Sequence, residues 1–233
     1  MNLSQLVNSV YALGYNFVQT ADDPTNPANV ALNSVYRDVC GRERWPFLEK
    51  TASAGSTVAA VNTYPLSTLT DLRQVDAIRL TDSSGVNYDL RNMAPQDFKA
   101  QTFEATSLPI TTGLPVCWTQ YAGSILFFPP PDGVYTIVVD YIVQPAALVS
   151  LTDVPIIPTQ WHDILVWGAA HELAFRERDW IGRNDSLNTF TQRLANMSSE
   201  YRLMQRQTSS RVQQSGVNDS FDYGIFQLGE GSA

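Results

Sequence analysis

The chain has 233 residues, a formal net charge of −8 at pH 7, and only 16% charged residues. This length suits one domain, or one domain with an insertion, and needs no disulfide or structural metal to fold. The acidic balance disfavours a free-standing nucleic-acid binder, which would need a basic face to neutralise phosphates. A hydrophobic content of 44% with so few charges excludes a disordered chain and favours burial against partners.

Three features indicate the cellular context. The first basic residue is Arg37, so no charged leader of a secretory signal is visible. No apolar run approaches the roughly 20 residues of a membrane-spanning helix. The two cysteines, Cys40 and Cys117, lie far apart in unlike contexts, which favours two buried reduced thiols over a disulfide. We expect a protein that is synthesised in a cytoplasm and has no membrane partner.

Two helices are expected at the start of the chain. The apolar residues of the first recur at helical spacing: Leu3, Leu6, Val7, Val10 and Leu13. A second helix begins at Pro27, where Asn26 can cap it, and ends near Gly41. Pro46 then predicts an extended exit over Trp45–Leu48.

The stretch from about 51 to 149 has the pattern of β structure. Tyr135, Ile137, Val139 and Tyr141 alternate with smaller or polar residues, as in a half-buried strand. Asp82–Gly85 has the residues of a hairpin turn. Strands are expected near 56–61, 75–81, 86–91, 116–121, 125–128 and 135–143, with a short helix beginning near Pro95.

The last two helices carry the strongest pattern. Thr159 can cap a helix over 160–180 whose apolar residues fall nearly all round, which predicts a central, buried helix. In the next helix, apolar residues follow spacings of three and four: Leu187, Phe190, Leu194, Met197, Tyr201 and Met204. We assign the helical core to Trp161, Leu165, Leu187, Phe190, Leu194 and Met197.

These elements predict an α+β protein. Its expected architecture is an antiparallel four-helix bundle with a β-rich domain inserted between helices 2 and 3, followed by an extended C-terminal tail. Residues 1–49 supply helices 1 and 2, 50–157 the inserted domain, 158–207 helices 3 and 4, and 208–233 the C-terminal arm.

The sequence predicts no catalytic residue, cofactor or metal ion. His162 and His171 are nine residues apart, so on one helix they point to opposite sides and cannot share an ion. The chain has no Gly-x-Ser-x-Gly motif and no glycine-rich phosphate loop. The one enzymatic alternative is a small hydrolase built around His171 and Glu172.

Arginine gathers in the last two helices. Residues 161–215 hold seven arginines against six acids, whereas 50–160 have a net charge of −4. Helix-surface ion pairs and a protein interface are equally good interpretations of this pattern. The polar tail holds spaced aromatic residues, which suits either a segment that folds onto a partner or a disordered terminus. The candidate partner-binding residues are Arg202, Arg206, Arg211, Phe221, Tyr223 and Phe226.

Three segments of the chain together resemble a known protein family. The first is Leu126–Gly133 with Tyr135–Tyr141, Pro145 and Leu148 after it. The second is Trp45–Leu48, which follows a helix that contains Val35, Tyr36 and Arg37. The third is the start of the long helix, with Pro158, Trp161, His162, Asp163, Leu165, Gly168 and Ala169. Over roughly residues 1–205 this pattern resembles the head-to-tail adaptor proteins of tailed bacteriophages, also called connector or tail tubular A-type proteins.

The resemblance implies a structural virion protein at the head–tail junction, made in the host cytoplasm. Copies of such proteins form a ring, typically of twelve, below the portal protein, and genomic DNA passes through its channel without sequence-specific binding. The β domains face tail or nozzle proteins, and the C-terminal arm grips the portal. A tail-base or receptor-binding virion protein is the alternative of similar shape.

Overall fold

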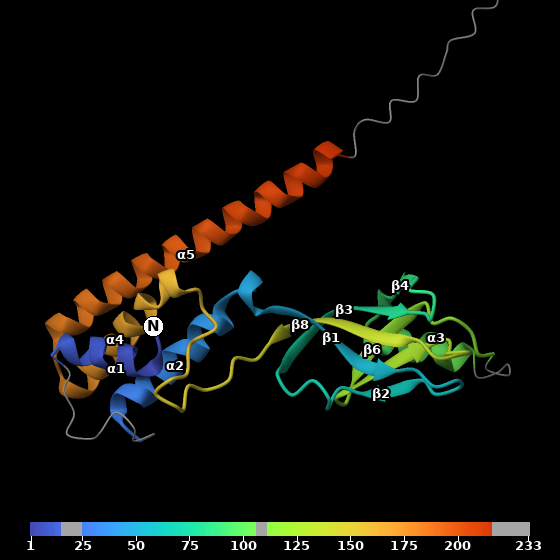
Figure 1. Ribbon diagram of the computed structural model, residues 1–233, viewed down its shortest axis with the longest axis horizontal. Helices are drawn as coiled ribbons and strands as arrows, with labels where there is room; N and C mark the ends of the chain where they lie inside the picture. The colour runs from blue at the N-terminus through green and yellow to red at the C-terminus, as the bar shows by residue number, and fades with distance from the viewer. Residues whose placement is uncertain (15–24, 106–110, 216–233) are drawn as a thin grey trace, which may run out of the picture.

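The computed structural model describes residues 1–14, 25–105 and 111–215, without the side chains of 101–105, 180 and 204–215. The described residues form five α-helices and two four-stranded sheets, which confirms the α+β class. Four helices form a helical body at one end of the molecule, and two four-stranded sheets form the other end (Figure 1). The buried apolar side chains form two separate clusters, one in each part.

The helical body contains α1 (Leu3–Ala12), α2 (Pro27–Arg42), α4 (Asp163–Glu177) and α5 (Trp180–Ser215). Asn2 caps α1 through a capping box with Gln5, and the Asn26 side chain accepts a hydrogen bond from the Ala28 amide at the start of α2. α4 is the buried centre, because its apolar residues face three neighbours. α1, α2 and α5 all pack directly on α4.

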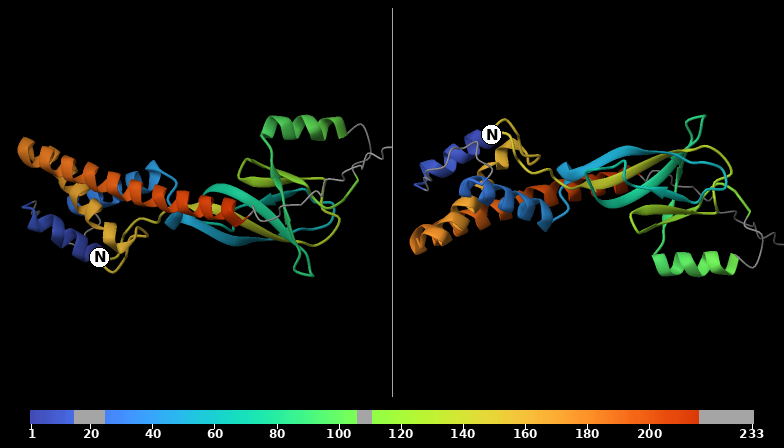
Figure 2. Two further views of the ribbon diagram at one scale, coloured as in Figure 1. Left: turned by 90° about the horizontal axis from the view of Figure 1, so that it is seen from above. Right: turned by 90° about the horizontal axis from the view of Figure 1, so that it is seen from below.

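The prediction of an antiparallel four-helix bundle is wrong. A fifth helix, α3 (Pro95–Ala105), belongs to the β part, and α4 occupies the centre of the helical body instead of one corner of four. α1 packs on α4 in the same direction, since the Met1 amino group lies 2.7 Å from Nδ1 of His162 where α4 begins. The 36-residue α5 is much longer than its partners and projects beyond them (Figures 1 and 2).

A glycine allows two helices to approach α4 closely. A Cβ atom built on Gly168 would lie 2.4 Å from Cγ1 of Val35 in α2 and 3.1 Å from the ring of Phe190 in α5. Real Cβ atoms do not make contacts of 2.4 Å, so a side chain here would displace α2. The absence of a side chain therefore sets the distance between these helices.

The strands are β1 (Glu49–Ser56), β2 (Thr63–Pro65), β3 (Leu72–Thr81), β4 (Asn87–Asp89), β5 (Arg91–Asn92), β6 (Cys117–Tyr121), β7 (Ser124–Phe128) and β8 (Thr136–Val143). One sheet has the order β1-β8-β3-β4 and the other β2-β7-β6-β5. Their apolar faces share one cluster, in which Ile137 and Val139 of the first sheet join Trp118 and Phe127 of the second.

Two local expectations are corrected. The strand expected at 56–61 is instead β1, which ends at Ser56 and bulges between Ser53 and Gly55 against β8. The exit over Trp45–Leu48 is not extended: Pro46–Leu48 forms a 3₁₀ turn, and the Leu48 amide donates to the Trp45 carbonyl at 3.0 Å. Pro46 stands in the first turn, where its missing N–H costs nothing.

A segment without helix or strand, residues 144–158, returns from β8 to α4 along the helical body. Asn33 of α2 holds it by two hydrogen bonds to Leu148, one to the carbonyl at 2.9 Å and one from the amide at 2.8 Å. A short 3₁₀ turn (Thr159–Trp161) then leads into α4. Over the described ranges, no helix has both the length and the hydropathy needed to cross a membrane.

Candidate functional site on the long helix

α5 is anchored over its first half and free of the helical body beyond it. Phe190, Leu194 and Met197 are buried against the helical body, and Tyr201 is half-buried at its edge. From there the helix runs on to Ser215 and projects past the other helices, above the sheets (Figure 1). The place where α5 leaves the helical body is therefore the natural starting point for a partner contact.

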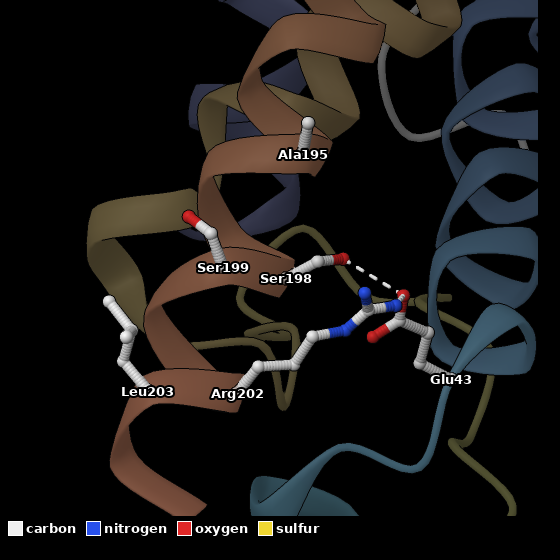
Figure 3. Close-up of a pocket in the computed structure, with 6 residues that line it drawn as sticks. All are labelled: Glu43, Ala195, Ser198, Ser199, Arg202 and Leu203. Carbon is white, nitrogen blue, oxygen red and sulfur yellow. Dashed lines mark hydrogen bonds and ion pairs between the residues drawn. The ribbon is translucent and has the colours of Figure 1, made fainter. Parts of the chain in front are cut away.

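An open cleft of about 500 Å³ lies where α5 leaves (Figure 3). Glu43, at the end of α2, faces the α5 residues across this cleft. Oε1 of Glu43 accepts hydrogen bonds from Arg202 at 2.7 Å and from Ser198 Oγ at 3.1 Å. The Arg202 side chain is 67% exposed, so this ion pair contributes at most about 1 kcal/mol to stability. The remaining lining residues are Ala195, Ser199 and Leu203.

Three aromatic rings support the cleft from the α2 side. Trp45 and Phe47 stack with centroids 5.7 Å apart, and Tyr201 meets both edge-on at 5.8 and 5.7 Å. The indole N–H of the buried Trp45 donates to the Val39 carbonyl at 2.7 Å, which satisfies its one polar group. Burial raises the pKa of Tyr201. The trio fixes α5 to the segment that leads into β1.

The same segment is tied to the sheets by arginine. Arg73 of β3 donates to the carbonyls of Cys40 and Gly41 at 3.0 and 3.2 Å, and so satisfies the end of α2. Arg44 forms a bidentate salt bridge with Asp76, with N–O distances of 2.8 and 2.7 Å. The end of α2, the start of β1 and the exit of α5 thus converge in one braced junction, which sets the direction of α5.

The structure describes the side chain of only one of the six candidate partner-binding residues. Arg202 lies in the cleft of Figure 3. Arg206 and Arg211 are on the part of α5 whose side chains the structure does not describe, and Phe221, Tyr223 and Phe226 lie outside the described residues. Sequence reasoning missed Glu43, whose position beyond the end of α2 carries no periodic signal.

The residues assigned to the helical core are also located by the structure. Trp161, Leu165, Phe190, Leu194 and Met197 are at most 8% exposed. Leu187 differs, because it is 38% exposed while Ser186 is buried. Positions three and four residues before Phe190 can both face inward, and the rotation of α5 on α4 turns Ser186 toward the core.

Each of the two histidines has a ring nitrogen within hydrogen-bond distance of a backbone carbonyl in the helical part of the molecule. Nε2 of His162 lies 2.7 Å from the Ile157 carbonyl, and burial lowers the pKa of this histidine. Nδ1 of His171 lies 3.2 Å from the Arg183 carbonyl of α5, whereas Glu172 accepts from Ser34 of α2 at 2.9 Å. His171 and Glu172 line one open cleft of about 350 Å³, but their hydrogen bonds run to different helices. No three His, Cys, Asp or Glu side chains gather as metal ligands among the described residues.

The described residues thus form a helical body, a two-sheet domain and a long helix that projects from the helical body. The sequence matches the family described as SU10 adaptor protein over residues 1–218. The chain therefore belongs to the SU10 adaptor family, a family of phage head-to-tail adaptors, and is a structural adaptor protein of a phage. No curated protein matches it.

Proposed function

We propose that twelve copies of this chain form a ring at the head–tail junction of the virion. The ring joins the portal protein to the tail or nozzle proteins and encloses part of the channel for genomic DNA. Membership of an adaptor family over residues 1–218 supports the junction role. The projecting α5 is the structural observation that carries the proposal, because a braced helix that leaves its own helical body has surface to offer another protein.

The portal contact is assigned to the end of α5 and the residues after it. Between Glu200 and Ser215 the chain has three arginines, Arg202, Arg206 and Arg211, and no acid. Arginine suits a protein interface because its planar fork pairs with carboxylates and is desolvated more easily than lysine. The aromatic residues Phe221, Tyr223 and Phe226 supply apolar anchors for the same partner.

The charge of the chain suits a conduit for DNA. Twelve copies at −8 each carry −96 formally, although counterions screen most of this charge. A negative wall repels phosphates within about 8–10 Å, the Debye length at physiological salt. DNA then passes without sequence-specific binding and without adhering to the wall.

The tail contact is assigned to the end of the sheets farthest from the helical body. Four loops meet there, at 57–62, 82–86, 111–116 and 129–135, and backbone hydrogen bonds tie the first and third to the fourth. These loops contain no lysine or arginine. They expose apolar side chains at Val58, Val61, Val86, Val116 and Val134. Exposed apolar patches of this kind mark protein contacts.

Removing residues 212–233 tests the portal assignment. We expect this truncation to weaken attachment to purified portal at least tenfold and to leave the melting temperature unchanged, because the helical core ends before residue 212. Negative-stain images of the full chain on portal should show rings. A truncated chain that binds portal as well as the full chain would refute the assignment to the arm, and the absence of rings would refute the ring.

A further inference from the structure

A stripe along the solvent side of α5 is almost uncharged. It is formed by Ile181, Asp185, Asn188, Gln192, Ser199 and Leu203, which recur at helical spacing on the side away from Phe190 and Leu194. We call it the outer stripe. Ile181 and Leu203 at its two ends are 79% and 58% exposed. A helix face turned to water normally carries many charges, whereas the centre of a protein interface is depleted of them.

A second surface with exposed apolar side chains lies on the other side of the helical body. It combines α2 with the returning segment 144–158, and we call it the return face. Its exposed side chains include Val30, Arg37, Val149, Val154 and Ile156. Val149 and Val154 are 70% and 61% exposed. An open groove of about 590 Å³ runs between α2 and this segment. Figure 2 shows α5 and the returning segment on opposite sides of the helical body.

The return face is rigid, as a docking surface must be. The Asn33 side chain donates to the Leu148 carbonyl and accepts from the Leu148 amide, and the Ile156 amide donates to the Tyr36 hydroxyl at 2.9 Å. Burial raises the pKa of Tyr36 to about 12, so this hydroxyl stays neutral. Asp153 accepts from two backbone amides at the start of the segment. Little conformational entropy would be lost when a partner binds here.

Each surface has one exposed charge without an ion pair, and the two charges are opposite. These are Asp185 on the outer stripe and Arg37 on the return face, neither of which has an ion-pair partner among the described residues. Asp153 of the return face is only partly exposed and accepts from two backbone amides. The neighbouring charges are already engaged, since Arg193 pairs with Asp163 and Asp38 pairs with Arg42. An acid on one surface thus matches a cation on the other.

The two charges also lie at about the same level along α4. Two residues before Asp185, the Arg183 carbonyl contacts His171. Two residues before Arg37, Val35 lies against Gly168. Because His171 and Gly168 are less than one turn apart on α4, copies placed side by side bring Asp185 of one near Arg37 of the next.

We infer that the outer stripe of one copy packs on the return face of a second copy. The contact joins two different surfaces, so it is heterologous, and its repetition forms a ring when the rotation between neighbouring copies closes. This inference rests on the proposed ring and assigns its lateral interface. Ile181 and Leu203 are the apolar anchors, and the Asp185–Arg37 pair sets the register between copies.

Single substitutions test each surface in the full chain. Ile181→Asp on the outer stripe and Val149→Asp on the return face should each weaken self-association at least tenfold in sedimentation velocity. The matched control is Tyr121→Asp, an apolar side chain that is 52% exposed at the end of β6 and lies outside both surfaces and the tail contact, which should assemble like the unaltered chain. All three sites are exposed, so circular dichroism melts should not change.

Mixing the two defective variants gives the sharpest readout. Ile181→Asp chains keep a working return face and Val149→Asp chains keep a working outer stripe, so an equimolar mixture should form dimers and no rings. Arg37→Glu and Asp185→Arg should each weaken assembly, and the two together in one chain should restore it.

Failure of this inference is distinguishable from failure of the proposed function. Rings that survive all these substitutions would overturn the assignment of the two surfaces and leave the ring intact. A full chain that binds portal while copies never associate would overturn the lateral contact and leave the adaptor role intact. Mixtures that stay monomeric would also overturn the heterologous contact.

Discussion

The indole of Trp45 and the phenol of Tyr201 meet edge to face with their centroids 5.8 Å apart. This contact joins the segment that enters the sheets to the last anchored turn of α5. Phe47 contacts both rings, so the three side chains act as one joint. The direction in which α5 projects therefore depends on residues distant from it in the sequence.

Tyr201→Ala should lower the free energy of unfolding by about 2–3 kcal/mol, because it removes two aromatic contacts and buried ring area. Tyr201→Phe keeps the ring and should cost less than about 1 kcal/mol. Urea denaturation of both variants measures the difference. Equal stability of the alanine and phenylalanine variants would show that the joint does not hold α5.

Gly168→Ala should destabilise the protein by about 1–3 kcal/mol, since the new methyl group would overlap Val35. Gly41→Ala is the matched control within a helix, because a Cβ there meets nothing within 4 Å. That change should stabilise α2 by about 0.5–1 kcal/mol through helix propensity. Thermal melts that shift in the same direction for both variants would contradict the close packing at Gly168.

Phe190→Ala and Leu194→Ala should each cost about 2–5 kcal/mol, because both side chains are buried where α5 meets the helical body. Leu187→Ala should cost less than about 1 kcal/mol, because Leu187 is 38% exposed. Chemical denaturation of the three variants tests the rotation of α5. A loss at Leu187 as large as that at Phe190 would place Leu187 in the core.

His162 should make the protein less stable in mild acid. Burial lowers its pKa in the folded state below the ordinary 6.5, so the unfolded chain takes up a proton first. The stability that this histidine contributes is complete above pH 6.5 and is lost as the pH falls through the lowered pKa. His162→Gln should flatten the curve of unfolding free energy between pH 7 and 5. An unchanged slope in that variant would assign the acid sensitivity to other groups.

Periodicity alone was enough to find the buried stripe of α5. Spacings of three and four residues from Phe190 through Leu194 to Met197 mark one helix face, and any neighbour must pack on that face. The apolar residues on nearly all sides of α4 likewise predicted a central helix. Asp82 and Gly85 predicted a hairpin turn, and the Gly85 amide donates to the Asp82 carbonyl at 3.1 Å.

β1 was missed because an exposed strand at the edge of a sheet lacks alternation. Its polar and small residues, Glu49–Ser56, form a strand only because β8 offers a paired backbone. The prediction of a four-helix bundle failed for a related reason. Local patterns show that a helix has an apolar face, but they do not show how many neighbours share the central helix.

The sequence by itself determined that each long helix has a buried apolar face, and that the chain belongs among α+β proteins with an acidic, lightly charged composition. Only the tertiary structure decided where α5 leaves the helical body. Glu43 meets Arg202, and Trp45 meets Tyr201, across more than 150 residues of chain. Periodicity is a property of neighbouring residues along one element, whereas these contacts depend on how α4 positions α2 and α5 in space.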